Sequence, residues 1–444
     1  MIQRPKQAVD PITLGDGPLY NAHGEIRLPK DRFFDPWHRA ISQRLQAVIQ
    51  EACGMVQVYE DHFGLRQRKR KVSDQKILEE TVEAILCDMM VVHLSGETRG
   101  SAVPLSHSVL GTRSRYRPAA FTKQLPNILK ALASSELDFI RMQVGWQKNF
   151  GDRGQRTLIW PGWRILKRIE EHNISLADIG RRPFREVIVL KAPKQDHWDE
   201  SQYLDYEDTP SIVAMRQQMI EINEWLEQAD IDVPDIELAE RLHLSDKSLR
   251  RVFTRGSFES GGRLFGGFWQ YMKKDDRLYC LAINEEGVSG LDFGQIAIRI
   301  AYSLVGSEPP EGDLYDIAGH ARFYRPGIKK LFNALLSSQQ PINRKPRGTK
   351  GILPPVSLPT LIEQIGKKHP AIKPLFFTSA CHKIQFIESQ IMVEVILRLK
   401  QKNIVALPIH DGLVVASQEE DQTKQIMEEV AFQLTGIKIP VTIE

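Results

Sequence analysis

The chain has 444 residues and a mass of 50.7 kDa, enough for two or three domains, and 42% of its residues are hydrophobic. Its 59 basic and 56 acidic residues nearly balance at a formal net charge of +3, so nucleic-acid binding would have to come from local patches. No apolar run approaches about 18 residues and residues 1–11 have no apolar signal core, so we expect no membrane span and no membrane partner. The four cysteines form no CxxC pair and no zinc spacing, which indicates reduced thiols in a cytoplasmic protein.

Residues 1–118 are predicted to form a mostly helical N-terminal region. Apolar residues recur at helical spacing over residues 40–51 and 74–94, on either side of a basic run at 66–71. A short charge run is more typical of a solvated segment than of a nucleic-acid site, and both interpretations stay open.

Residues 119–200 show the element order of a winged-helix DNA-binding module. A predicted helix at 121–132 is followed by a strand at 137–144, a turn with two glycines, and a second strand at 156–161. The turn, or wing, and its flank carry the basic residues Lys148, Arg153 and Arg156. Such modules bind duplex DNA through a helix in the groove and through backbone contacts. A helix packed on an ordinary hairpin explains the pattern equally well.

Residues 201–258 are predicted to form a helical, thumb-like element. Within it, residues 210–229 have the apolar stripe of an amphipathic helix. Residues 235–253 resemble a helix-turn-helix, with Ser245 able to cap the second helix. That pattern is weak evidence alone, and its position just before Arg263 favours an element that delivers nucleic acid to the region that follows.

Two isolated aspartates follow apolar strands in the C-terminal region. Asp292 follows the run 287–291, and Asp411 lies at the tip of an apolar hairpin between 404–409 and 413–415. Phosphoryl transfer uses two magnesium ions about 4 Å apart, and Mg²⁺ takes only one or two carboxylates from the protein. The two aspartates therefore suffice for a metal pair. Taken singly, an aspartate beside a glycine at a strand end is more often a turn former.

A predicted helix between the two aspartates carries a pair of cations. Arg325 and Lys329 are four residues apart and so share a helix face, and Pro326 suits the first helical turn. This pair could hold a triphosphate, although a solvated basic face is the commoner arrangement. The basic, proline-containing segment 341–350 suits either a phosphate backbone or a mobile linker.

Several ordered motifs in this region resemble those of family A polymerases. DFGQIAIR at 292–299 resembles their first palm motif, written DYSQIELR in bacterial DNA polymerase I. IHDG at 409–412 resembles their third motif, VHDE in the DNA polymerases and IHDS in single-subunit phage-type RNA polymerases. RPGIKKLFN at 325–333 matches the RxxxK spacing of the fingers helix that holds the incoming nucleotide. GRLF at 262–265 and FIESQ at 386–390 resemble the GRVY and FVHSQ segments of the phage-type enzymes.

The resemblance covers a little under half of the chain, residues 259–444, and implies an α+β fold. It predicts a right-handed polymerase palm, an antiparallel sheet with helices, together with shortened fingers. Asp292 and Asp411 would be catalytic and would hold two Mg²⁺ ions, or Mn²⁺, with the backbone carbonyl of Phe293. The residues expected to bind the nucleotide are Arg325, Lys329, Asn333 and Ala297. The residues expected to contact the nucleic acid are Arg263, Arg299, His410 and Gln390.

This chain departs from the family pattern in several places. Ala297 replaces the glutamate with which the DNA polymerases exclude a 2′-hydroxyl, so the resemblance implies tolerance of ribonucleotides. Asn333 and Ser337 fall where the fingers helix of the family has an aromatic residue and a tyrosine. Base stacking is therefore in doubt, unless Phe332 takes that place in a shifted register. Gly412 replaces the glutamate that follows the third-motif aspartate in the DNA polymerases.

Asp411 follows Asp292 by 119 positions, fewer than full-sized fingers need, which indicates a reduced polymerase. We expect a template-directed nucleotidyltransferase, a DNA polymerase or primase-polymerase that acts by two-metal phosphoryl transfer. Its partners would be a DNA template and primer, dNTPs and, given Ala297, NTPs. A non-enzymatic hypothesis stays open, in which a DNA-binding replication initiator carries a degenerate polymerase core. The sequence does not decide between dNTPs and NTPs, and it shows neither a primer requirement nor the replication partners.

Overall fold

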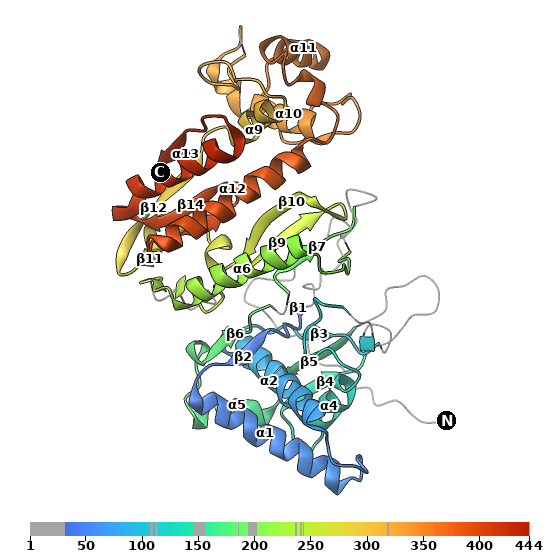
Figure 1. The fold of residues 1–444 in the computed structure, drawn as a ribbon. Coiled ribbons are helices and arrows are strands. Elements are labelled where there is room, and N and C mark those ends of the chain that lie inside the picture. Colours follow the sequence, from blue (N-terminus) through green and yellow to red (C-terminus); the bar gives the residue numbers. More distant parts are fainter. Residues whose placement is uncertain are drawn as a thin grey trace. The chain divides into compact units, whose positions relative to one another are not determined.

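The computed structural model divides into two compact units. The first comprises residues 1–112 and 119–179, and the second comprises residues 113–118 and 180–444 (Figure 1). The residues that it describes are 32–106, 110–111, 114–145, 156–184, 186–193, 202–235, 238–239, 242, 244–317 and 319–443. Among these, no helix has both the length and the apolar character that crossing a membrane requires.

The first unit packs helices against a four-stranded sheet. Its helices are α1 (Gln43–His62), α2 (Val72–Leu94), α4 (Leu125–Leu132), α5 (Trp163–Glu171) and the short turn η1 (Leu176–Asp178). Its strands are β1 (Arg32–Phe33), β2 (His38–Ala40), β3 (Ser101–Val103), β4 (Ile140–Gln143), β5 (Thr157–Pro161) and, at the start of the second unit, β6 (Ile179–Arg181). The sheet order is β1-β3-β5-β4, with β1 parallel to β3 and the other pairs antiparallel. Helix α2 lies against α1, α5 and β5, which explains why its residues 84–92 are all buried.

The structure bears on the winged-helix prediction for the described residues only. Helix α4 and strands β4 and β5 follow one another in the predicted order, whereas residues 146–155, with Lys148 and Arg153, lie outside the described residues. Strand β5 continues the sheet into β3, and α4 shares one hydrophobic core with α1 and α2. The winged-helix module and its alternative, a helix packed on an ordinary hairpin, both stay predictions. The domain limits at 118, 200 and 258 stay predictions.

The described part of the second unit contains a mixed sheet, an antiparallel sheet and more helices than the first unit. Its strands are β7 (Ile188–Leu190), β8 (Ile231–Asp232), β9 (Leu249–Thr254), β10 (Ser257–Gly266), β11 (Ala282–Ile283), β12 (Glu286–Phe293), β13 (Leu407–Ile409), β14 (Gly412–Ala416) and β15 (Val441–Ile443). Its α-helices are α6 (Pro210–Gln228), α8 (Lys274–Cys280), α9 (Ile296–Leu304), α10 (Arg325–Ser337), α11 (Leu358–Lys368), α12 (Cys381–Gln401) and α13 (Glu420–Thr435). Its short helical turns are η2 (Phe268–Gln270), η3 (Arg322–Tyr324), η4 (Lys373–Leu375) and η5 (Ser417–Glu419).

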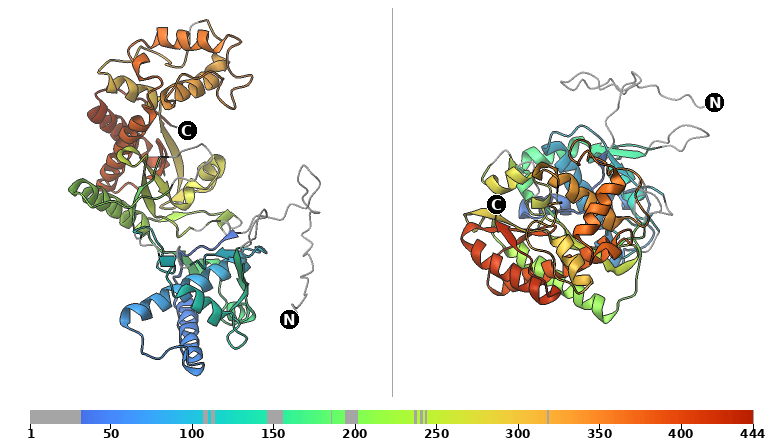
Figure 2. Two further views of the ribbon diagram at one scale, coloured as in Figure 1. Left: turned by 90° about the vertical axis from the view of Figure 1, so that its right-hand side faces the viewer. Right: turned by 90° about the horizontal axis from the view of Figure 1, so that it is seen from above.

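The central sheet of this unit has the strand order β13-β14-β12-β11-β8, and β15 pairs with β12 on its other side. All of these pairs are antiparallel. Helix α13 packs on β12, β14 and β15, and α12 lies beside α13 and also contacts α9 and β10 (Figure 1). Helices α10 and α11 lie beyond the N-terminal end of α12, away from the central sheet (Figure 2). The fold is therefore α+β, with strands and helices in separate layers.

The helix-turn-helix prediction for residues 235–253 is wrong in its second half. Residues 249–254 form strand β9, which pairs with β10 on one side and with β7 on the other. Leu249 and Phe253 are fully buried in the core, and the two neighbouring strands complete the backbone hydrogen bonding of β9. These long-range pairings outweigh the local capping signal at Ser245. Helix α6, predicted at 210–229, is confirmed.

Candidate active site

The two aspartates lie at the same end of neighbouring strands. Asp292 is the penultimate residue of β12, where it pairs with Gly412 of β14. Ile409 of β13 also pairs with Gly412, so His410 and Asp411 form the two-residue turn of the hairpin. His410 adopts the left-handed conformation there, with φ 57°. Asp292 is exposed and Asp411 is half-buried, so both carboxylates are accessible to a ligand.

Gly412 allows this close approach. A Cβ atom at position 412 would lie 2.1 Å from Oδ1 of Asp292 and 2.8 Å from the backbone oxygen of Leu291. Both distances are shorter than van der Waals contact, so the present geometry leaves no room for a side chain. Glycine at position 412 is therefore required by the close packing of the two strands.

The turn η2 holds the β13–β14 hairpin by hydrogen bonds. Trp269 donates its indole N–H to the carbonyl oxygen of Pro408 at 3.1 Å, and Gln270 donates to the same oxygen at 2.9 Å. Trp269 is completely buried. Because Pro408 lies three positions before Asp411, these bonds help to hold the hairpin tip in place.

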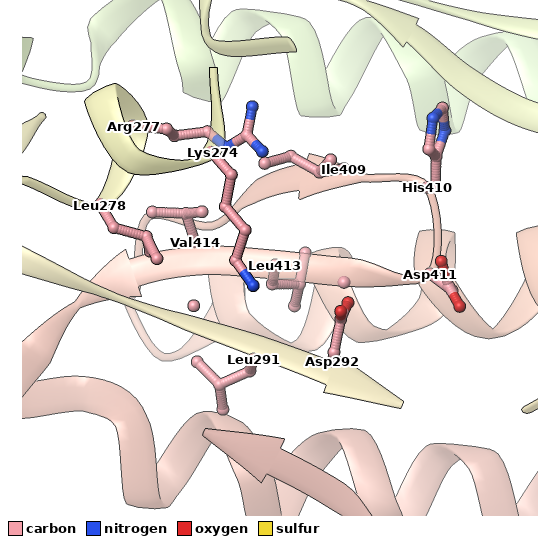
Figure 3. Close-up of a pocket in the computed structure, with 12 residues that line it drawn as sticks. Lys274, Arg277, Leu278, Leu291, Asp292, Ile409, His410, Asp411, Leu413 and Val414 are labelled. Carbon is pink, nitrogen blue, oxygen red and sulfur yellow. The ribbon is translucent and has the colours of Figure 1, made fainter. Parts of the chain in front are cut away.

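A pocket of about 180 Å³ contains both aspartates (Figure 3). Its other charged lining residues are Lys274 and Arg277, which are one helical turn apart on α8. In Figure 3, Lys274 extends from α8 toward the strand that carries Asp292, and His410 stands on the same side of the sheet as α8. The arrangement sets two carboxylates against two cations, which suits a ligand that combines metal ions with phosphates.

Lys274 and Arg277 were not among the predicted site residues. Arg277 donates to the carbonyl oxygens of Trp269 at 3.0 Å and Met272 at 2.8 Å, which orients its guanidinium. Burial lowers the pKa of Arg277, and the negative charge of Asp292 opposes that shift. The pair stands in the string KKDDR at the start of α8. Strand β11 separates α8 from β12, the strand that carries Asp292. Its i,i+3 spacing was a signal, but two adjacent aspartates made the segment look like an ordinary solvated helix.

Arg263 lies on β10 and forms a two-point ion pair with Glu388 of α12. The Nε–Oε1 and Nη2–Oε2 distances are 2.6 and 2.9 Å, and Glu388 is only 1% exposed. Burial raises the pKa of Glu388, Arg263 lowers it, and the charge of Asp411 raises it. Asp411 and this pair are therefore within electrostatic reach of each other. Glu388 belongs to the FIESQ segment, from which the sequence analysis selected only Gln390.

Arg251, also missed, supports the same junction from inside the core. It is completely buried on β9, and it donates to the carbonyl oxygen of Gly262 at 3.1 Å and to the hydroxyl of Ser389 at 3.0 Å. Burial lowers its pKa to about 10. Gly262 immediately precedes Arg263 in the sequence, and Ser389 immediately follows Glu388. Arg251 therefore helps to position the Arg263–Glu388 pair.

Helix α10 is confirmed, and its apolar residues Ile328, Leu331, Phe332 and Leu335 are buried. Arg325 forms an ion pair with Asp313, and its Cζ atom lies 5.4 Å from the ring centroid of Tyr315. Lys329 and Asn333 are exposed on the outer face of the helix. Burial raises the pKa of Tyr315 to about 12, and the charge of Asp411 contributes to that rise.

Phe332 is not available to stack on a base. It is 1% exposed, and its ring packs against Tyr315, His369 and Phe376 at centroid distances of 6.0, 5.5 and 5.6 Å. The shifted-register hypothesis is therefore wrong, because the ring belongs to the core.

The remaining predicted site residues lie around the strand ends. Ala297 and Arg299 are on α9, where Ala297 is half-buried and Arg299 donates to the carbonyl oxygen of Lys438 at 3.0 Å. This contact turns Arg299 toward the chain that leads into β15. Gln390 is half-buried on α12, and Phe293 is buried, with its N–H directed to the Asp411 carbonyl oxygen at 3.4 Å.

The donor set fits magnesium better than a transition metal. In the described part of the chain, no three or more His, Cys, Asp and Glu side chains gather into a metal cluster. The pocket instead offers two accessible carboxylates, and Mg²⁺ takes one or two carboxylates and fills its shell with water and phosphate oxygens. Burial lowers the pKa of His410, and the charges of Arg263 and Arg277 lower it further, whereas the charge of Asp411 raises it.

Comparisons with known proteins leave the family open. No protein-family model and no curated protein matches the sequence. Among solved structures, the chain is similar to the POL domain of Pol1 from M. smegmatis in complex with DNA primer-template and dNTP. The identity is 10% and the TM-score is 0.32, with 92% of this chain and 66% of that chain covered. A likeness of this size does not bear on function, which has to be inferred from the site itself.

Proposed function

We propose that this protein is a template-directed nucleotidyltransferase, a DNA polymerase or primase-polymerase that extends a nucleic-acid chain by phosphoryl transfer. One observation carries the proposal. Asp292 and Asp411, 119 positions apart, meet at adjacent strand ends of one antiparallel sheet and share a pocket with two cations. Two-metal phosphoryl transfer requires carboxylates in such a position, with basic groups nearby for phosphate oxygens.

The roles follow from the position of each residue. Asp292, Asp411 and the backbone carbonyl of Phe293 would hold two Mg²⁺ ions, or Mn²⁺. When bound, these ions activate the attacking hydroxyl and neutralise the charge of the leaving phosphate. Arg325 and Lys329 would bind the triphosphate. Arg325 must then exchange the Asp313 carboxylate for phosphate, so its present ion pair holds the guanidinium ready near the start of α10.

Other residues would contact the sugar of the nucleotide, the primer and the template. Ala297 would face the sugar of the incoming nucleotide, and its short side chain leaves room for a 2′-hydroxyl. Asn333 would lie farther along the nucleotide-binding face of α10. Arg263, His410, Gln390 and Arg299 would line the path of the primer and template, with Arg263 held in place by Glu388. The protein thus contributes orientation and charge, the two terms on which phosphoryl transfer mainly depends.

The experiment is nucleotide incorporation on primed and unprimed single-stranded DNA with Mg²⁺ or Mn²⁺, comparing dNTPs with NTPs. We expect Asp292→Ala and Asp411→Ala each to reduce incorporation by roughly a thousandfold, because a metal site is worth several kcal/mol to the transition state. Asp421→Ala is the matched control, since Asp421 is an exposed aspartate at the start of α13. Synthesis without a primer would identify a primase activity.

Two other outcomes are informative. Incorporation that survives Asp411→Ala would overturn the assignment of the metal pair. If no nucleotide is incorporated under any condition while DNA binding is retained, the replication initiator with a degenerate polymerase core becomes the better reading.

A further inference from the structure

A long segment around α10 contains basic residues and no acidic ones. Residues 317–362 include no Asp or Glu. They hold eight cationic residues, namely Arg322, Arg325, Lys329, Lys330, Arg344, Lys345, Arg347 and Lys350. The chain is nearly neutral overall, so its remaining residues carry more acidic than basic groups. Such asymmetry gives one part of the surface a positive potential.

The basic loop after α10 is folded back onto the helix. A Cβ atom at Gly327 would lie 1.9 Å from the carbonyl oxygen of Ile352, so the loop crosses α10 in direct contact at this glycine. Lys330 donates to the carbonyl oxygen of Gly348 at 3.1 Å, and Thr349 is buried and donates to Pro346 at 2.6 Å. These contacts decide against the mobile linker that the sequence left open for residues 341–350.

The contact of Lys330 with Gly348 joins the loop, with four cations, to α10, with two. The six are Lys329, Lys330, Arg344, Lys345, Arg347 and Lys350, which we call the basic surface. All six are exposed, and within the described residues none of them forms an ion pair with a carboxylate. The two hydrogen bonds that their side chains make go to carbonyl oxygens, from Lys330 to Gly348 and from Lys345 to Pro354. Their charges are therefore available to an anion.

An exposed aromatic ring precedes the same helix. Phe323, in the turn that leads into α10, is 61% exposed, and its ring packs against that of Tyr324 at a centroid distance of 3.8 Å. A row of cations combined with an exposed, supported ring is the combination that binds single-stranded nucleic acid, because phosphates meet the cations and a base stacks on the ring.

We propose that the basic surface binds single-stranded nucleic acid through its phosphates, with Phe323 as a stacking position for a base. In the proposed function, on which this second step rests, the bound segment is the template strand ahead of the site. The binding itself does not depend on Asp292 or Asp411.

The test compares two variants that remove the same charge. Arg344→Gln/Arg347→Gln/Lys350→Gln changes three cations of the basic surface whose side chains make no hydrogen bond in the described residues. The control, Lys402→Gln/Lys424→Gln/Lys438→Gln, removes three lysines elsewhere in the second unit. Fluorescence anisotropy of a labelled oligothymidine, measured over a salt series, gives the affinity and its salt dependence. A charge-retaining variant, Arg344→Lys/Arg347→Lys, guards against a loss caused by misfolding.

We expect the basic-surface variant to bind at least about tenfold more weakly at low salt and to lose about 2 from the slope of log Kd against log salt, at about 0.7 per phosphate contact on a single strand. The control and the charge-retaining variant should bind like the wild type. Equal weakening in the control, or an unchanged slope, would overturn the proposal. A loss on duplex DNA equal to that on the single strand would also overturn it.

Primer extension separates this proposal from the proposed function. The basic-surface variant should extend primers poorly on a template with a long single-stranded overhang and normally on one with a single-nucleotide overhang. Asp411→Ala should fail on both templates and bind single strands like the wild type. If no protein extends a primer, but the basic-surface variant alone loses binding, the surface is supported and the nucleotidyltransferase is rejected.

Discussion

Gly412 is the residue whose identity the site geometry constrains most directly. Any Cβ atom there would collide with the Asp292 carboxylate and the Leu291 carbonyl, so we expect Gly412→Ala to push the two strand ends apart. A displacement of about 1 Å at a catalytic group can cost on the order of a hundredfold in rate. We therefore expect incorporation to fall between about ten- and a hundredfold in Gly412→Ala.

The matched control is Gly287→Ala on the same strand as Asp292. A Cβ atom at position 287 would have no heavy atom within 4 Å, so the substitution should leave incorporation unchanged. Full activity in both variants would show that the position of Asp292 does not depend on the missing side chain at 412.

His369 makes the stability of the second unit depend on pH. It is completely buried, with Nδ1 2.9 Å from the Tyr302 hydroxyl and Nε2 2.8 Å from the Leu314 carbonyl oxygen. Since the carbonyl only accepts, Nε2 carries the proton and Nδ1 accepts from Tyr302. Burial lowers the pKa of His369 to about 4, although the bond to Leu314 opposes that shift.

The sign of the pH effect follows from this lowered pKa. In the unfolded chain the pKa is about 6.5, so the unfolded state binds more protons between about pH 6.5 and pH 4. The contribution of neutral His369 to the free energy of unfolding is therefore complete above about pH 6.5. It is lost as the pH falls toward 4, by about 3 kcal/mol in total. The protection factors of α11 amides, that is, exchange rates corrected for the intrinsic rate at each pH, should fall over this range in the wild type and less so in His369→Gln. An identical pH profile in both proteins would contradict the assignment.

At the scale of elements, the sequence predicted features that depend on neighbouring residues. The strand ending near Asp292, the hairpin around Asp411 and the helix at Arg325 each follow from apolar periodicity and turn chemistry within about ten residues. The structure brings these elements together through the pairing of β12 with β14, which no local pattern contains. The expectation that the two aspartates meet came from the chemistry of a metal pair and from the family resemblance, not from a local pattern.

The features that were predicted wrongly or not at all depend on residues far away in the sequence. Strand β9 looked helical because its capping signal is local, whereas its partners β7 and β10 are supplied by the fold. Glu388, Arg251 and Lys274 were missed because each acquires its meaning from a contact far away in sequence, such as the 125 positions between Arg263 and Glu388. A buried charge pair cannot be recognised until both elements that carry it are in place.

We expect the loss of the buried Arg263–Glu388 ion pair to destabilise the second unit more than the loss of the exposed Glu363–Lys367 pair. Glu388→Ala would leave the partly buried Arg263 without its carboxylate, and breaking a buried pair in this way costs about 3 kcal/mol or more. Glu363→Ala removes a pair with Lys367 in which both side chains are mostly exposed, and we expect no measurable change. Chemical denaturation followed through the second unit tests both. Equal effects would mean that Arg263 finds another partner when Glu388 is removed.

At the scale of the whole molecule, the chain builds two hydrophobic cores rather than one. The core of the first unit ends at Ile179, and that of the second begins at Val187. Large chains divide in this way because a single core stops growing efficiently. With separate cores, the two units are expected to unfold in separate transitions, so a substitution should act on the unit that contains its contacts.

The short segment 113–118 tests this expectation, because its contacts belong to the second unit while the residues before and after it belong to the first. Arg115 donates to Asp208 at 2.9 Å and to Glu186 at 3.2 Å, and its guanidinium lies 3.8 Å from the ring centroid of Tyr206. Tyr116 donates to the Leu204 carbonyl oxygen at 2.9 Å and accepts from the Leu190 N–H at 3.0 Å.

We expect Arg115→Ala to destabilise the second unit by about 1 to 3 kcal/mol, because charge-assisted hydrogen bonds to a buried carboxylate are lost, while Arg216 still pairs with Glu186. The first unit should be unaffected, although Arg115 lies between its two stretches of sequence. Hydrogen exchange followed by mass spectrometry along a denaturant series reports each unit through its own peptides. Arg99→Ala, which breaks an exposed pair with Glu97 in the first unit, is the control and should move neither transition. A shift of both transitions together in Arg115→Ala would show that the two cores unfold as one cooperative structure, in which case the segment couples them rather than serving the second unit alone.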